Sequence, residues 1–330
     1  SINIENRNIF FQNNIGETLS IIQISKLNLF YDKIKLLNKF SLMGEVFKIP
    51  FIFDLDKDLI NNISKVSLVS KKLKIELKNE ENNNKEIFYG INNLSIFNSK
   101  LNSEYTFENK LLSFKSIDSN INNNETTYNG KLNFSPFDLT SNISLEKINL
   151  FNFMNIDSIL MNIFKSELLF NDNLSVSVSL KSKNILDHKL LNDLMLNLKI
   201  NNGKINFDNS KISIDKIGIL KINNSELNSS GNKIIFTSDV VIDIKNSDNF
   251  FSFFQTPKKI RKKIDNISLS LDFDLINNNL NIKNFVINNQ DSELITKNTL
   301  DLLNNKENRK IINLIPFKIL INKILTLHSG

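Results

Sequence analysis

Apolar and polar residues alternate along most of this chain. In residues 174–181, LSVSVSLK, the leucines and valines fall on one side of an extended chain, and the serines and the lysine fall on the other. A period of two, carried by β-branched and aromatic residues, is typical of half-buried β-strands. Clusters of Asn, Asp, Ser and Gly between the runs indicate short turns. The pattern therefore predicts a chain built almost wholly of strands.

The alternation recurs from one end of the chain to the other. It covers residues 19–29, 43–55, 66–77, 87–97, 105–114, 128–134, 143–150, 174–180, 194–200, 205–214, 217–227, 234–244, 267–275, 280–287 and 294–302. We expect roughly 16 to 20 strands, which exceeds the roughly 10 at which an open twisted sheet usually curls, splits or flattens. The alternatives are a sandwich of two sheets, a sheet closed on itself, or one long sheet folded lengthwise into a groove.

Three stretches follow a helical period instead. Residues 151–170 place apolar side chains at helical spacing, and residues 248–264 gather Phe250, Phe251 and Phe254 on one face before Pro257 interrupts them. Residues 316–327 begin at Pro316, which suits the first position of a helix, and continue with an apolar stripe. We therefore expect three short helices, at about 151–170, 248–264 and 316–327.

The runs lack the helical insertions that parallel βαβ units need, so mostly antiparallel meander pairing is expected. The predicted fold class is all-β: a long, twisted, mostly antiparallel sheet, curled into an elongated hydrophobic groove, with a few short helices. We divide it into an N-terminal groove segment, residues 1–150, and a C-terminal region with capping helices, residues 151–330. One continuous sheet is expected to run through both.

The composition narrows the chemistry. The 330 residues include 58 asparagines and no alanine, a bias typical of AT-rich coding sequences. There is no cysteine, which excludes disulfides and thiolate chemistry, and the two histidines are too few for a histidine-based metal cluster. The net charge of +6 is dispersed along the chain without a nucleic-acid-binding signature. We expect neither metal nor cofactor, and no nucleic acid partner.

Carboxylates spaced two or four residues apart on expected strands were weighed as a catalytic group. They are Asp239, Asp243, Asp272 and Asp274, and residues at this spacing share one face of a strand, as glycosidase or metal carboxylates could. The solvent-facing side of an alternating strand produces the same pattern without chemistry. We therefore expect no enzyme.

Residues 174–290 resemble the C-terminal region of the AsmA-like family, which includes the AsmA, TamB and YhdP types. The resemblance is carried by the spacing of apolar residues and glycines in LLNDLMLNLKINNGKINFDNSKISI and in the IGILKINNSEL strand that follows. Gly203 and Gly218 mark its turn and its step. The resemblance covers roughly the second half of the chain. The first half resembles the family only in that it is expected to form strands.

The resemblance implies an envelope protein of Gram-negative bacteria. Proteins of this family are associated with phospholipid movement between the inner and outer membranes and with outer-membrane integrity. The expected location is the periplasm, with an inner-membrane anchor in an N-terminal segment that this chain, which begins at Ser1, does not contain. The expected partners are phospholipid acyl chains, one or both membranes, and an envelope protein bound by strand addition.

Two sets of residues are hypothesised to contact lipid. The lining of the groove would comprise Val176, Val178, Leu194, Leu196, Leu198, Ile205, Phe207, Leu269, Leu271 and Phe273. A basic cluster would approach anionic headgroups, and it comprises Lys258, Lys259, Arg261, Lys262 and Lys263. The rival interpretation is a closed β-sandwich, a scaffold or adhesin module without a lipid ligand, in which the first set is ordinary core.

Overall fold

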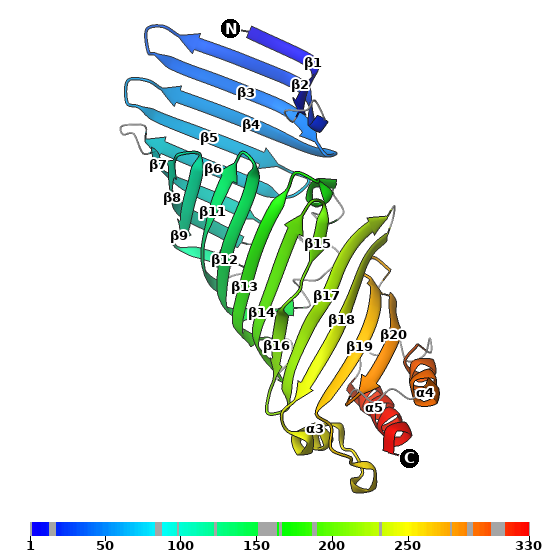
Figure 1. The fold of residues 1–330 in the computed structure, drawn as a ribbon. Helices are drawn as coiled ribbons and strands as arrows, with labels where there is room; N and C mark the ends of the chain where they lie inside the picture. Colours follow the sequence, from blue (N-terminus) through cyan, green and yellow to red (C-terminus); the bar gives the residue numbers. More distant parts are fainter. Residues whose placement is uncertain are drawn as a thin grey trace. The chain divides into compact units, whose positions relative to one another are not determined.

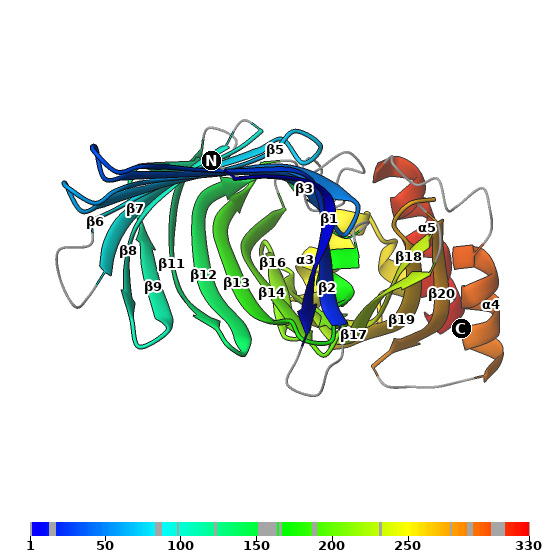
Figure 2. The same cartoon turned by 90° about the horizontal axis from the view of Figure 1, so that it is seen from above.

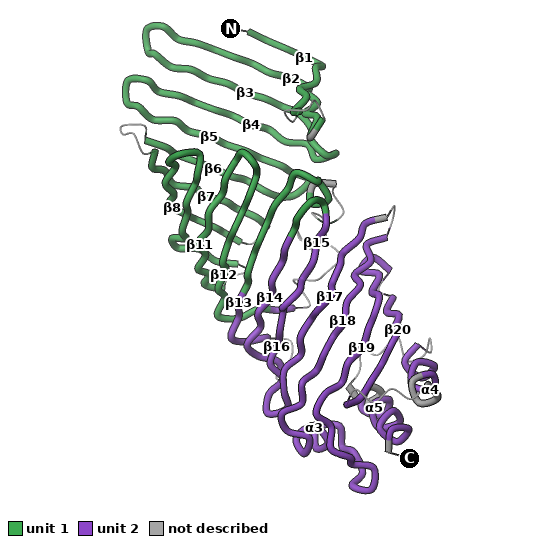
Figure 3. Tube along the Cα trace, viewed as in Figure 1, with its two compact units in different colours: residues 1–148, 152–180, 200–203 green, residues 149–151, 181–199, 204–330 purple. Residues whose placement is uncertain are grey.

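The computed structural model describes residues 2–12, 18–82, 88–97, 99–121, 124–150, 164, 167–186, 190–230, 233–277, 279–288, 293–304 and 314–329. These residues are mostly β-strand and form one large sheet of 20 strands with short helices (Figure 1). The expected all-β class is therefore confirmed. The chain divides into two compact units (Figure 3): unit 1 holds residues 1–148, 152–180 and 200–203, and unit 2 holds residues 149–151, 181–199 and 204–330.

Twelve strands lie entirely in unit 1. They are β1 Ile2–Gln12, β2 Thr18–Asp32, β3 Leu37–Val46, β4 Ile49–Asp58, β5 Ile63–Ser70, β6 Ile75–Asn82, β7 Phe88–Ile96, β8 Ser99–Glu108, β9 Leu111–Ser116, β10 Ser119–Ile121, β11 Asn124–Phe134 and β12 Phe137–Ile148. Two strands, β13 Ser175–Ile185 and β14 Leu191–Asn201, contain residues of both units. Unit 2 holds β15 Lys204–Asn206, β16 Ser210–Ile214, β17 Gly218–Ser230, β18 Lys233–Ile244, β19 Asn266–Asp274 and β20 Asn279–Ile287.

Unit 1 is an antiparallel meander. Strands β1 to β9 pair in chain order, β9 pairs with β11, and β11 pairs with β12. The short β10 pairs with β8 and β11. Within this unit β3 and β4 run across the direction of β11 and β12 (Figures 1 and 2), as the accumulated twist of a long sheet requires. In unit 2, β16 to β20 likewise pair antiparallel in chain order.

Tight turns join the strands. Phe47 and Lys48 both have positive φ between β3 and β4, as Asn109 and Lys110 do between β8 and β9. Two successive residues of this kind are typical of the type I′ hairpin turn, whose twist matches that of the strands. In a second kind of turn, the Asp58 carboxylate accepts hydrogen bonds from the N–H groups of Ile60 and Asn61 at 2.9 and 3.0 Å. The Asp32 and Asp274 carboxylates do the same at the ends of β2 and β19.

Several predicted strand boundaries were wrong. The runs 43–55, 66–77, 105–114 and 205–214 each predict one strand, but each contains parts of two strands joined by a turn. The turns between these strands, such as Phe47–Lys48, contain no glycine or proline, so the residue types do not mark them. The strand β1 was not predicted at all.

The predicted strand over 294–302 is instead the helix α4, Glu293–Asn304. The alternation there counted polar residues among the apolar positions, whereas the helix buries Thr299 completely and packs Leu300, Leu302 and Leu303 against a hydrophobic core. The packing of these side chains against the core favours the helical conformation of residues 293–304 over a strand. The structure thus contains a fourth helical stretch that the sequence reading missed.

Within residues 198–227 the alternation of apolar and polar residues is interrupted at turns and at a bulge. Asn202 and Gly203 form the turn from β14 to β15, and Asp208 and Asn209 form the turn into β16. Gly203 has φ +69°, a left-handed conformation in which a side chain is strained. A further slip in β17 between Asn223 and Glu226 is a β-bulge.

The expected helices near 248–264 and 316–327 are present. The first is α3, Ser247–Phe254, followed by the 3-10 turn η2, Lys258–Ile260, and the second is α5, Leu314–Ser329. Most of the expected helix at 151–170 lies outside the described residues, and its end is the 3-10 turn η1, Glu167–Phe170.

The helices of unit 2 pack together beside the last strands. In Figure 2, α4 lies against β20, and α5 lies beside α4. Their shared core consists of Ile217, Ile244, Phe250, Phe251, Phe254, Ile264, Ile267, Phe285, Ile287, Leu320, Ile324 and Leu325. The predicted aromatic face of α3 is thus buried against apolar side chains of β19, β20 and α5.

Candidate apolar binding face

The two faces of the sheet in unit 1 differ in polarity. Residues that pair directly across antiparallel strands point to the same face. One such row crosses all strands from β1 to β8 and is apolar throughout: Ile4, Leu27, Leu42, Phe53, Leu68, Leu77, Leu94 and Leu101. We call these eight residues, seven aliphatic and one aromatic, the aliphatic row. With strands about 4.8 Å apart, its seven spacings extend over about 34 Å.

The aliphatic row is only partly covered. Leu42 is buried, with 7% of its surface exposed, whereas Ile4 is 39% exposed and the other six side chains are half-buried. A layer packed on this face would bury the row as completely as the core of unit 2, where Phe251 is 3% exposed. The row therefore presents an apolar surface that the described residues leave accessible.

A second apolar row lies on the same face nearer the other end of the strands. It crosses β7, β8, β9, β11 and β12 and comprises Phe88, Phe107, Leu112, Leu132 and Leu139. The Phe107 ring contacts Phe88 and Phe134, with ring centroids 6.2 and 6.0 Å apart. The apolar surface of unit 1 thus continues from the first strands to β12.

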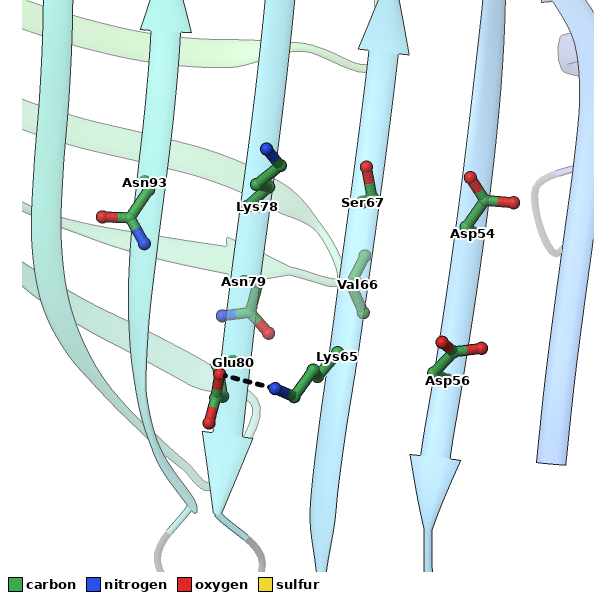
Figure 4. Close-up of a pocket in the computed structure, with 9 residues that line it drawn as sticks. All are labelled: Asp54, Asp56, Lys65, Val66, Ser67, Lys78, Asn79, Glu80 and Asn93. Carbon is green, nitrogen blue, oxygen red and sulfur yellow. Dashed lines mark ion pairs between the residues drawn. The ribbon is translucent and has the colours of Figure 1, made fainter. Parts of the chain in front are cut away.

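The opposite face of unit 1 is charged. Lys39, Asp56, Lys65 and Glu80 pair across β3 to β6 with alternating sign, and two of the contacts are ion pairs: Lys39 to Asp56 at 3.5 Å and Lys65 to Glu80 at 3.2 Å. A pocket on this face is lined by Asp54, Lys78 and Asn93 as well (Figure 4). These side chains are about half exposed, so each pair contributes roughly 0–1 kcal/mol to stability. Their alternation keeps this face hydrated.

A polar cluster interrupts the apolar face at β6 to β8. The Asn79 side-chain amide donates to the Tyr105 hydroxyl and to Asn92 Oδ1, at 2.9 Å in both cases. The Tyr105 hydroxyl in turn donates to Glu81 Oε2 at 3.1 Å. Burial, the largest influence, raises the pKa of Tyr105 to about 12. The Tyr105 ring lies directly over Gly90 on β7, in space that a Cβ at Gly90 would occupy.

The structure places several of the hypothesised lining residues of unit 2 on one face, because Ile205, Leu227, Phe236 and Phe273 pair in register across β15, β17, β18 and β19. Val176, Val178, Leu196, Leu198, Phe207, Leu271 and Phe273 are half-buried, and Leu194 is buried. Ile205 has no exposed surface and pairs with the buried Leu227, while Leu269 packs against the helical core of unit 2. Ile205 and Leu269 therefore occupy packed positions, and most of the exposed large hydrophobic side chains among the described residues belong to unit 1.

The sequence reading did not assign any residue of the aliphatic row to the site. Five members sit in predicted alternating runs, whereas Ile4, Leu42 and Leu101 lie outside them, and only the pairing register shows that the eight residues line up. Placing a turn in the middle of runs such as 43–55 would have revealed the register.

The basic cluster divides between packing and solvent. The Arg261 guanidinium donates to the Thr256 carbonyl at 2.9 Å and lies 5.8 Å from the centre of the Phe251 ring. Lys263 forms an ion pair with Asp265 at 2.9 Å. Lys258, Lys259 and Lys262 are exposed. Three of the five residues are thus available to a charged partner.

Each carboxylate that was weighed for catalysis has a partner of its own. Asp239 accepts from Asn224 and Ser270, Asp243 pairs with Lys221 at 2.6 Å, and Asp272 pairs with Lys283 at 2.7 Å. Asp274 accepts from Asn277 in its turn. Among the described residues, no group of three or more acidic or histidine side chains could hold a metal ion.

Comparison with protein families, curated proteins and solved structures yields no match. The AsmA-like resemblance therefore stays a prediction from the sequence. In the described part of the chain, no helix combines the length and the apolar character needed to cross a membrane.

Proposed function

We propose that this chain binds phospholipid acyl chains on the apolar face of unit 1, as part of a periplasmic protein that supports phospholipid transport between the inner and outer membranes. The observation that carries the proposal is the aliphatic row, eight apolar side chains in register of which only Leu42 is buried. The AsmA-like resemblance of residues 174–290 adds the envelope and the transport role.

The energetics fit such a ligand. Exposing a methylene group to water costs about 0.8 kcal/mol, so a 16-carbon acyl chain requires on the order of 12 kcal/mol unless an apolar surface covers it. Acyl chains span about 15 Å in one leaflet of a bilayer, half of its hydrocarbon thickness. The aliphatic row, at about 34 Å, is long enough to cover such a chain.

The rival is a closed β-sandwich without a lipid ligand. In a sandwich the apolar faces of two sheets bury each other, about 10 Å apart. The incomplete burial of Leu27, Phe53 and Leu68 favours the lipid-binding alternative.

Photo-crosslinking in cells tests the proposal. A benzophenone side chain at position 68, in the aliphatic row, is expected to capture phospholipid during expression in a Gram-negative host. The same side chain at position 67, where Ser67 belongs to the charged face, is the matched control and is expected to capture little. Lipid adducts are detected by mass spectrometry of the intact chain. Equal or absent capture at the two positions, with no phospholipid in native mass spectra, would refute lipid binding and favour the sandwich.

A further inference from the structure

The rim of the apolar face carries one row of polar residues. Lys57 on β4, Ser64 on β5 and Glu81 on β6 pair directly across the strands. They belong to the same face as the aliphatic row, because they are separated from Phe53, Leu68 and Leu77 by an even number of residues along each strand. Lys57 is exposed, and Glu81 is half-buried.

Two features make this row more than a solvated strand end. Glu81 is held in place by the Tyr105 hydroxyl, which is part of a buried side chain and is itself held by Asn79. This contact uses Oε2 and leaves Oε1 for another donor. The Lys57 ammonium forms no ion pair among the described residues, whereas Lys39 and Lys65 on the opposite face pair with Asp56 and Glu80 across the strands.

The spacing of the two charges matches a dipolar headgroup. Lys57 and Glu81 lie two strands apart, about 10 Å between their backbones, with only the small Ser64 between them. A phosphate directed to Lys57 and an ammonium directed to Glu81 would fit between the two side chains. Glu81 repels a headgroup that carries negative charge alone, so the pair discriminates as well as attracts.

The tails of the same lipid have a continuous path from this row. The next row towards the aliphatic row holds Leu55 and Val66, and the one after it holds Phe53 and Leu68. Two such steps along a strand are about 14 Å. A lipid whose headgroup sits at the rim therefore places its acyl chains on the aliphatic row.

We infer that Lys57 and Glu81 form a headgroup site for zwitterionic phospholipids with a primary ammonium group. This inference rests on the proposed function, since it assigns the headgroup of the lipid whose tails the aliphatic row binds.

The test measures headgroup preference. The purified chain is incubated with vesicles of equal parts phosphatidylethanolamine and phosphatidylglycerol and re-isolated, and its bound lipids are quantified by mass spectrometry. The wild-type chain is expected to carry at least a threefold excess of phosphatidylethanolamine. Glu81→Gln is expected to bring the ratio close to one while the total bound lipid changes less than twofold.

Glu80→Gln is the matched control, since Glu80 is the preceding residue on β6 but belongs to the charged face, and it should keep the wild-type ratio. A wild-type ratio of one, or equal effects of the two substitutions, would overturn the headgroup site while lipid binding stands. If the wild-type chain carries neither lipid, the proposed function fails as well.

Discussion

At the scale of single residues, Tyr105 is held on several sides within unit 1. Its ring occupies the space over Gly90, it is 5% exposed, and its hydroxyl is shared between Asn79 and Glu81. A buried hydroxyl stays favourable only where such partners replace water. The Tyr105 hydroxyl therefore links β8 to β6 across the intervening strand β7.

The ionisation of Tyr105 yields a prediction. A phenol whose pKa is raised in the folded state keeps its proton where the unfolded chain has lost it. The contribution of Tyr105 to stability is thus complete below about pH 10 and is lost as the pH rises towards its folded pKa of about 12. A tyrosinate absorbance titration of the wild-type chain should show a phase near pH 12 that Tyr105→Phe diminishes by one tyrosine, while the raised pKa values of Tyr89 and Tyr128 persist in that variant. Complete ionisation of the tyrosines by pH 10.5 in the folded chain would contradict this.

The sequence could predict which residues of a strand share a face, but not this cluster. Tyr105 lies 26 residues from Asn79 and 24 from Glu81, and their meeting depends on where two intervening hairpins turn. Because turns such as Phe47–Lys48 contain no glycine, proline or asparagine, their positions are not visible in the residue types. Alternation gives the faces of strands, while the turns decide which side chains become neighbours.

At the scale of elements, α4 covers the edge of β20. The Asn304 side chain accepts a hydrogen bond from the Ile282 N–H at 2.9 Å and donates one to the Ile282 carbonyl at 2.7 Å. A single amide thus takes the place of a partner strand at one residue of the edge. Unpaired backbone groups at sheet edges promote association between chains, and covering them is a common protection.

Removing this amide tests that role. Asn304→Ala should lower the free energy of unfolding by about 1–3 kcal/mol, because two backbone groups lose their partner. It should also increase self-association through β20. Asn298→Ala, at an exposed position of the same helix, is the control and should change neither property. Denaturant unfolding and size-exclusion chromatography are the measurements, and identical behaviour of the two variants would show that α4 protects the edge without Asn304.

Some helices and strands could be predicted from the sequence and others could not, for different physical reasons. The helix α3 was predictable because its phenylalanines recur at helical spacing, and β17 to β20 were predictable because Asn and Asp mark their turns. The helix α4 was not predictable, because residues 294–302 fit both a weak strand-like alternation and a helical period. Contact with the core of unit 2, which is assembled from residues far away in the chain, decides between them.

At the scale of the whole molecule, the two units are stabilised differently. Unit 2 has a contiguous core of α3, α5, β19 and β20, whereas the described buried apolar side chains of β1 to β5 are Ile24, Leu42 and Ile49. Stability within a protein follows the local density of buried apolar contacts. We therefore expect unit 1 to open at a lower cost than unit 2.

Hydrogen exchange of backbone amides can check this difference. Amides of β18 and β19 should exchange at least tenfold more slowly than those of β2 to β4, although all of these strands are paired on both sides. Addition of phospholipid should slow exchange in β2 to β4 and leave β18 and β19 unchanged. Uniform exchange across the strands would contradict the prediction, and protection confined to unit 2 would place the ligand there instead.

The two ends of the strand series are not alike. Among the pairings that the structure describes, β1 pairs with β2 alone, and Figure 1 shows its other side without a neighbouring strand, while α4 occupies the outer side of β20. The edge at β1 is thus open to a further strand, whereas the edge at β20 is covered by a helix. A strand that pairs with β1 would also need the correct register. With its apolar residues opposite Ile2 and Ile4 it would extend the apolar face, and a shift of one residue would place its polar residues on that face instead.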